Sequence, residues 1–354
     1  RQIGIYNPSG QNYVPQDKDA VSYYKEDSTG QVLQEGINEM GAMASWVAAA
    51  TSYSTSDLPM IPFYIYYSMF GFQRVGDMAW LAGDQQSRGF LLGATAGRTT
   101  LNGEGLQHED GHSHVLASTV PNCVSYDPAF AYEVAVILQD GLRRMYGPDQ
   151  ENVYYYVTLM NENYHQPAMP EGVEEGIRRG IYKLLSVGGD KAKVQLLGSG
   201  TILNEVIKAS AILGEQYGIA SEVFSVTSFN ELARDGQSVA RHNMLHPEAE
   251  PRVPYLAEVL SDDPAIASTD YVKNHAEQIR AYLPGDSYKV LGTDGFGRSD
   301  SRANLRRHFE VNAGYVVVAT LHELSKRGEM DKAEVVKAID EFGIETDKVE
   351  PLHA

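Results

Sequence analysis

Short apolar segments alternate with segments of helical spacing through the second half of the chain. Strands are predicted at residues 194–197, 221–226, 265–268 and 288–291, and helices at residues 201–217, 301–309 and 313–326. Successive parallel strands need a long crossover connection, and a helix is the usual one. The alternation therefore predicts a mostly parallel sheet with helices on both faces, which is a three-layer α/β domain.

The first half contains similar components. We expect a helix rich in small residues at 35–53, a buried strand at 59–67, a helix at 130–145 and a strand at 152–159. A proline-bearing stretch at 165–170 marks a domain boundary. The sequence thus predicts two domains, residues 1–168 and 169–354. Residues 236–257 are polar and contain prolines, and we expect a long loop there.

Composition excludes several classes of function. With 29 Lys and Arg against 47 Asp and Glu, the formal net charge is −18, which opposes nucleic-acid binding. The longest uncharged run, residues 40–56, is too short for a convincing membrane span, and no signal peptide is recognisable. The single cysteine, Cys123, excludes a disulfide within the chain and fits a reducing, cytoplasmic compartment. Since the first residue is Arg1, we expect the chain to begin inside a longer protein.

The densest polar cluster is the run at residues 101–114. Residues 108–112 satisfy the HExxH pattern, in which two histidines one helical turn apart bind zinc. That reading requires a helix, and the glycines of this segment disfavour one. A hydrogen-bonded polar loop is a second reading. The third, which we favour, is a substrate-facing loop whose histidines and carboxylates share protons. The cluster comprises Glu104, His108, Glu109, Asp110, His112 and His114.

Two glycine-rich turns and one carboxylate complete the candidates. Gly198-Ser-Gly200 follows a predicted strand, and a tight strand-to-helix connection is favoured over a phosphate site. The turn at residues 291–299 can cradle an anion with Arg298 or can simply be a turn. Glu39 lies in the small-residue helix. A lone Glu there is usually solvated, but a buried one can share a proton.

Longer strings resemble one known family. Residues 34–42, 62–72, 83–86 and 97–114 resemble the pyrimidine-binding domain of bacterial homodimeric pyruvate dehydrogenase E1 components. Residues 226–229, 232–236 and 291–299 resemble the C-terminal domain of the same family. The resemblance covers essentially the whole chain. It implies a transketolase-like fold, with a pyrimidine-binding domain followed by a transketolase C-terminal domain.

The resemblance also implies roles for individual residues. Glu39 matches the Glu that hydrogen-bonds N1′ of the aminopyrimidine of thiamine diphosphate, so that the 4′-nitrogen can take a proton from the thiazolium. Phe70 matches the aromatic ring that stacks on the pyrimidine. Further residues are implied as cofactor-binding or substrate-channel groups, with His112 and His114 as weaker candidates: Ile37, Tyr67, Arg74, Glu104 and His108.

The implied activity is the oxidative decarboxylation of pyruvate with transfer of the acetyl group to the lipoyl group of the E2 acetyltransferase, by a homodimer. The family holds the diphosphate through Mg²⁺ with a Gly-Asp-Gly motif on an N-terminal domain. That motif does not occur here, since Gly83 and Asp84 are followed by Gln85. We therefore assign no metal ligand to this chain, and expect it to bind only the pyrimidine end of the cofactor.

Three alternatives remain at this point. The chain can belong to another thiamine enzyme, such as a transketolase or the β chain of a two-subunit 2-oxo acid dehydrogenase. It can be a zinc hydrolase that uses His108 and His112. It can also be a non-catalytic assembly fragment, in which the acidic surface and the small-residue helix only mediate dimerisation.

We predict that these 354 residues alone bind thiamine diphosphate weakly and show no turnover, because the diphosphate motif is not among them. Isothermal titration calorimetry of the isolated chain with Mg²⁺ and the cofactor measures this. Tight, saturable heat release would refute the prediction.

Overall fold

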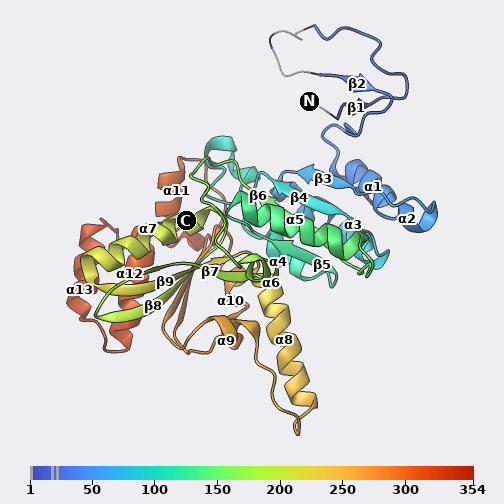
Figure 1. Cartoon of the computed structure of the whole chain (residues 1–354). Helices are drawn as coiled ribbons and strands as arrows, with labels where there is room; N and C mark the ends of the chain where they lie inside the picture. Colours follow the sequence, from blue (N-terminus) through green and yellow to red (C-terminus); the bar gives the residue numbers. More distant parts are fainter. Residues whose placement is uncertain (1–2, 17–19, 21–23) are drawn as a thin grey trace.

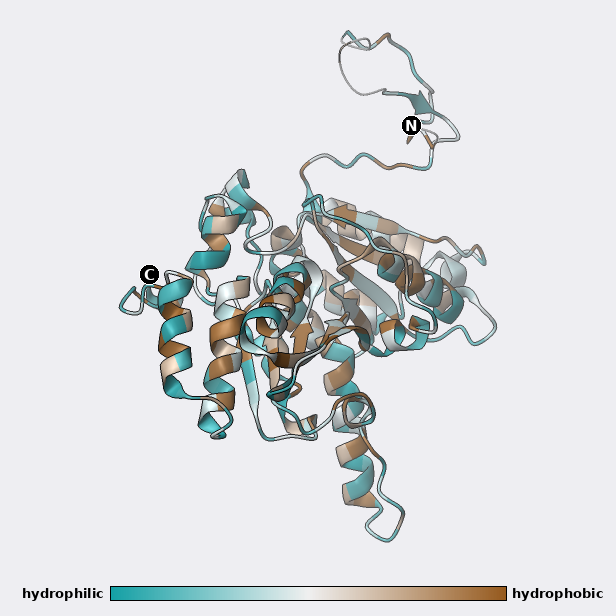
Figure 2. Ribbon diagram, turned by 60° about the vertical axis from the view of Figure 1, so that its left-hand side comes forward, coloured by the Kyte–Doolittle hydropathy of each residue, from teal (hydrophilic) through white to brown (hydrophobic). Residues whose placement is uncertain are grey.

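The computed structural model describes residues 3–16, 20 and 24–354, and contains two α/β units that lie side by side (Figure 1). We call residues 39–159 the first unit and residues 181–353 the second unit. Strands β1 (Ile5–Tyr6) and β2 (Glu26–Asp27) pair in parallel and lie apart from both units. Hydrophobic residues gather in the central strands and on the helix faces that cover them (Figure 2).

The first unit is built on a four-stranded parallel sheet of order β3-β4-β6-β5. Alternate side chains of a strand point to opposite faces. Accordingly Tyr154 and Tyr156 pack beneath α1 and α3, whereas Tyr155 packs beneath α5. The elements are α1 (Glu39–Ala50), α2 (Ser52–Thr55), β3 (Phe63–Tyr66), η1 (Ser68–Phe70), α3 (Phe72–Asp84), β4 (Phe90–Ala94), η2 (Asn102–Glu104), η3 (Leu106–His108), α4 (Ser113–Ser118), β5 (Cys123–Tyr126), α5 (Ala131–Tyr146) and β6 (Tyr154–Leu159).

The second unit has a five-stranded sheet of order β11-β10-β8-β9-β7, in which only β7 is antiparallel. Leu196 packs beneath α7 and α12, and its neighbour Leu197 packs against α8 and α10 on the other face. Helix α6 (Glu174–Arg179) joins the units. The elements are β7 (Ile181–Val187), β8 (Ala192–Gly198), η4 (Gly200–Ile202), α7 (Leu203–Ile212), η5 (Leu213–Tyr217), β9 (Ile219–Val226), α8 (Phe229–Leu245), α9 (Tyr255–Val259), β10 (Ala265–Ser268), α10 (Lys273–Glu277), η6 (Arg280–Tyr282), β11 (Tyr288–Leu291), α11 (Arg302–His308), α12 (Ala313–Lys326), α13 (Lys332–Glu341) and η7 (Pro351–His353).

The predicted fold class is confirmed, because both units are three-layer α/β structures with mainly parallel sheets. Periodicity located β10, β11 and α12 with the bounds that the structure has, and α5 within one residue at each end. The division at residue 168 stays a prediction. In the part of the chain that the structure describes, no helix combines the length and apolar character that crossing a bilayer requires.

The loop predicted at residues 236–257 is wrong, because much of it is helical. Helix α8 runs to Leu245, and α9 follows at Tyr255–Val259. The side chain of Ser228 caps α8 by accepting a hydrogen bond from the Glu231 amide. Only the first part of α8 packs on the core, and its far end projects from the molecule (Figure 1). That projecting end is polar because it has no core to cover, which is why its sequence resembles a loop.

The strand predicted at residues 59–67 exists as β3, but it is not buried as we expected. Phe63 is 47% exposed and Ile65 is 64% exposed, whereas Tyr66 is buried. Strand β3 lies at the edge of its sheet and pairs only with β4. An apolar run cannot reveal whether both of its faces are covered within one chain. One face of this strand is therefore left open.

Candidate active site

The predicted site residues gather where three parallel strands of the first unit end. Tyr67 directly follows β3, and residues 95–112 follow β4. Asn161 follows β6, the next strand in the sheet. In open α/β sheets, ligands bind at the carboxyl ends of the strands. The topology therefore places these side chains where a small-molecule site is expected.

Two aromatic rings and one imidazole form a cluster at this edge. The ring centroid of His108 lies 4.9 Å from that of Tyr67 and 5.0 Å from that of Phe70. Tyr67 and Phe70 are 6.1 Å apart in an edge-to-face arrangement. Nδ1 of His108 is buried and has no hydrogen-bond partner among the described residues. An unpartnered buried nitrogen is the kind of polar group that a bound ligand can satisfy.

Glu39 is tied to this cluster through an arginine. Nη1 of Arg74 lies 2.8 Å from Oε1 of Glu39, and the Arg74 guanidinium sits 4.0 Å from the centre of the Phe70 ring. The Glu39 side chain is 18% exposed, so it is neither solvated nor fully buried. It is thus a positioned, partnered carboxylate rather than the lone Glu that the sequence indicates.

The position of Glu39 follows from how its helix begins. Helix α1 starts at Glu39 rather than at residue 35, because Gly36 adopts a left-handed conformation and Asn38 caps the helix. The Asn38 side chain accepts a hydrogen bond from the Gly41 amide. A carboxylate in the first helical turn is stabilised by the helix dipole. The first turn of α1 thus presents Glu39 towards α3 and Arg74.

Other predicted residues lie outside the cluster. Ile37 precedes α1 and is 97% exposed, so the described chain leaves it uncovered. Glu104 is exposed and accepts a hydrogen bond from Asn161 at 3.1 Å. His112 is the residue just before α4, and its amide donates to Oδ1 of Asp110. His114 is buried in the core, where its Nε2 lies 3.0 Å from Oγ1 of Thr158.

His114 therefore packs in the core and does not join the aromatic cluster. Burial, together with the neighbouring His275, lowers the pKa of His114 well below its usual value. The two imidazoles stack with centroids 4.9 Å apart. A neutral imidazole in this environment packs as an aromatic ring of the core.

The helix that a zinc protease site needs is not formed at residues 108–112. The single turn η3 ends at His108, and His112 is the residue before α4. These two histidines are therefore not one helical turn apart on a common face. Across residues 3–16, 20 and 24–354, no cluster of His, Cys, Asp and Glu has a metal-binding arrangement.

A group of buried ionisable residues lies beside the site, and of these only Glu109 was predicted from the sequence. Arg98, Glu109, Asp127 and Asp270 are all at most 3% exposed. Burial raises the pKa of Glu109 to about 7 and that of Asp127 to about 7. The short apolar strand β10 ends at Ser268, and Asp270 follows it with only Thr269 between them. A carboxylate just beyond a buried parallel strand was the available signal.

Both glycine-rich turns have structural roles. Arg98 donates to the backbone oxygens of Thr293 and Gly295, so the second turn binds a side chain of the first unit. At the first turn, Gly200 adopts a positive φ, and a Cβ there would lie 2.7 Å from Oδ2 of Asp127. The favoured reading of this turn, a tight strand-to-helix connection, agrees with η4 and α7 following β8.

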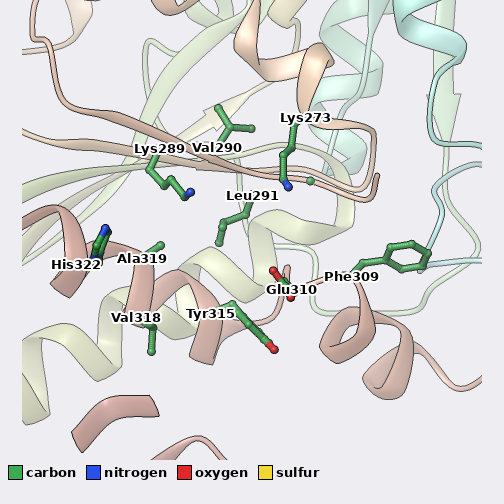
Figure 3. A pocket seen from close by; sticks show the side chains of 11 residues that line it. Lys273, Lys289, Val290, Leu291, Phe309, Glu310, Tyr315, Val318, Ala319 and His322 are labelled. Atoms are coloured by element: carbon green, nitrogen blue, oxygen red, sulfur yellow. The ribbon is translucent and has the colours of Figure 1, made fainter. Parts of the chain in front are cut away.

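A separate hollow of about 210 Å³ lies in the second unit between β11 and α12 (Figure 3). Lys289 and Leu291 face Tyr315 and His322 across it. None of the predicted site residues lines this hollow. It therefore plays no part in the site at the carboxyl ends of β3, β4 and β6.

Transketolases are among the solved structures with a similar fold. One from Leishmania mexicana has a TM-score of 0.64 at 19% identity, and the match covers 85% of this chain and 38% of that chain. A split-gene transketolase, described as an inactive beta4 tetramer, has a TM-score of 0.57 at 13% identity. That match covers 92% of this chain and 92% of that chain. The fold and the position of the site define a transketolase-like α/β protein.

Sequence comparison gives the family. The model of the pyruvate dehydrogenase E1 component middle domain matches residues 1–167, and that of the transketolase-like TK C-terminal domain matches residues 180–312. The pyruvate dehydrogenase E1 component of Escherichia coli (strain K12) is 70% identical over 351 residues, which are 99% of this chain and 40% of that protein. The chain belongs to the pyruvate dehydrogenase E1 component family, and it spans about 40% of the length of such relatives.

We predict that Asp127→Asn flattens the pH dependence of thermal stability. The raised pKa of Asp127, about 7 against an ordinary 3.8, stabilises the fold below about pH 4, and this contribution is lost as the pH rises to about 7. Asn mimics the protonated carboxyl and does not titrate. The difference in Tm between pH 4.5 and 7.5, measured by circular dichroism, should be smaller in the variant. The control is Asp149→Asn, where the side chain is 70% exposed; identical pH profiles for Asp127→Asn and the parent would contradict the prediction.

Proposed function

We propose that this chain supplies the aminopyrimidine end of the thiamine diphosphate site in a pyruvate dehydrogenase. The enzyme would decarboxylate pyruvate oxidatively and transfer the acetyl group to a lipoyl group of the dihydrolipoyl acetyltransferase (E2). The observation that carries the proposal is the arrangement of Glu39, Arg74 and Phe70, with His108 beside them. The identity to E1 components, 70%, against 19% to a transketolase, favours pyruvate over a transketolase substrate.

The residues fit a flat, nitrogen-bearing ring. Phe70 offers an aromatic face, Ile37 offers an uncovered apolar side chain, and Glu39 offers a carboxylate held in place. When bound, thiamine diphosphate supplies an electron sink for the decarboxylation of a 2-oxo acid. The protein's contribution is to bind, orient and tune the cofactor.

Glu39 would share a proton with N1′ of the pyrimidine. Proton transfer between the two groups requires a carboxylate whose oxygen is held in place, and the hydrogen bond from Arg74 holds it. Because Arg74 also lies over the Phe70 ring, it links the hydrogen-bonding group to the stacking group. Arg74 is thus assigned to orienting Glu39 rather than to binding an anion.

His108 would take part in proton transfer during the reaction. Its unpartnered Nδ1 and its contacts with Tyr67 and Phe70, the rings proposed to meet the cofactor, support this role. Tyr67 is 47% exposed and is available to bond the pyrimidine or the substrate. Glu104, on the same loop and exposed, would line the substrate channel.

A second copy of the protein would complete the site. Ile37 is uncovered, and one face of β3 is open and apolar, which fits the homodimer that the family resemblance implies. Exposed residues of this region include Met40, Met60, Ile61, Phe63, Ile65 and Tyr67. Mg²⁺ and the diphosphate would be held by residues outside this chain, in a cytoplasmic enzyme. The buried, free Cys123 is compatible with that compartment.

We predict that Glu39→Gln in the complete enzyme lowers kcat for thiamine-dependent pyruvate decarboxylation by about 100-fold or more, because a positioned acid–base group is lost. Turnover with saturating cofactor is the measurement. Glu35→Gln is the matched control, since Glu35 is exposed just before the same helix and its carboxylate accepts a hydrogen bond from the Ser45 hydroxyl. The proposal fails if the Glu39 variant retains turnover close to that of the control.

A further inference from the structure

The loop that carries His108 belongs to the first unit but is held by the second. We call residues 97–112 the bridging loop. It leaves the first sheet just after Ala96, whose amide donates to Leu159 at 3.1 Å. Its next residues bond to groups more than a hundred positions away in the sequence. His108 then returns to Tyr67 and Phe70 in the first unit.

Asp270 binds the start of the bridging loop with both carboxylate oxygens. Oδ1 accepts hydrogen bonds from the amide and hydroxyl of Thr99, at 2.9 and 2.7 Å. Oδ2 accepts from the amide and hydroxyl of Thr100, at 3.2 and 2.6 Å. The carboxylate is fully buried. When ionised, an Asp carboxylate has two acceptor oxygens and no donor. It can therefore satisfy all four of these N–H and O–H donors.

The loop sequence is adapted to this contact. Gly97 has a φ of +92°, and a Cβ at this position would lie 2.4 Å from Oδ2 of Asp270. The glycine therefore allows the carboxylate to approach the backbone. Arg302 of α11 adds a bond to the Thr100 carbonyl at 2.7 Å. The backbone and hydroxyl groups of Thr99 and Thr100 are thus hydrogen-bonded by residues of the second unit.

The end of the bridging loop is also held by the second unit. The Val272 amide, two residues after Asp270, donates to the Gly111 carbonyl at 2.7 Å. The Arg298 amide donates to Oε2 of Glu109 at 2.6 Å. His108 therefore lies between two anchors that the second unit provides.

We propose that Asp270 is a positioning residue for the reaction: it fixes the bridging loop across the junction of the two units and so holds His108 against Tyr67 and Phe70. The effect on turnover rests on the proposed function, whereas the effect on the loop does not. Asp270 contacts none of the residues assigned to the cofactor. It acts through the loop backbone, and its loss would misplace His108 without removing Glu39 or Phe70.

The test is Asp270→Asn in the complete enzyme. Asn retains one acceptor oxygen but presents an amide donor to Thr100, so one side of the contact is broken. Hydrogen exchange of peptides within residues 97–112 should accelerate. kcat for pyruvate should fall by about 10- to 100-fold, as for a misplaced group, while cofactor affinity stays near that of the parent.

Glu133→Gln is the matched control. Glu133 is also fully buried and accepts bonds from the Ala129 and Phe130 amides and from the hydroxyls of Tyr182 and Ser225, across the same junction. It has no bond to the bridging loop. Its replacement should lower Tm without changing loop exchange or kcat.

Two results would overturn the proposal: unchanged loop exchange in Asp270→Asn, or equal losses of kcat in Asp270→Asn and Glu133→Gln. If Asp270→Asn does not fold, Thr100→Val removes one hydroxyl from the contact and is held to the same criteria. A parent enzyme that shows no thiamine-dependent pyruvate turnover would defeat the proposed function instead, and loop exchange would still test the contact.

Discussion

The carboxyl edges of two parallel sheets meet in this molecule, and the hydrogen bonds across that junction determine where the site lies. The Asp127 amide, just after β5, donates to Thr227, and the Gly200 amide, just after β8, donates to Asp127. Parallel sheets collect their strand-to-helix loops at one edge. Joining two such edges brings the loops of both units together. The bridging loop therefore has a rigid partner on each side.

The two units contribute in different ways. The first unit provides the groups assigned to chemistry, which are the Glu39 carboxylate, the Phe70 face and the His108 imidazole. The second unit provides none of these, but its backbone and buried side chains hold the loop that carries His108. Transketolases with 19% identity share the fold, so the fold alone does not define the reaction. The chemistry depends on a few side chains whose geometry the whole fold maintains.

Much of this architecture could be predicted from the sequence, because strands and helices with a clear apolar period reveal their type locally. The residues of the aromatic cluster were predicted because the sequence strings that contain them resemble those of one known family. What could not be predicted depends on distant neighbours. Asp270 meets Thr100 across 170 positions of sequence, and no local pattern reveals that contact. The open face of β3 and the projecting end of α8 were misjudged for the same reason: burial depends on what lies opposite.

In the proposed site, Glu39 is held by Arg74 beside Phe70 and hydrogen-bonds a ring nitrogen of the cofactor's pyrimidine. A crystal structure of the complete protein with thiamine diphosphate and Mg²⁺ tests it most directly. We expect a Glu39 carboxylate oxygen within about 2.6–3.2 Å of the ring nitrogen N1′, with the ring stacked on Phe70. A cofactor ring bound elsewhere, with Glu39 still paired only to Arg74, would contradict it.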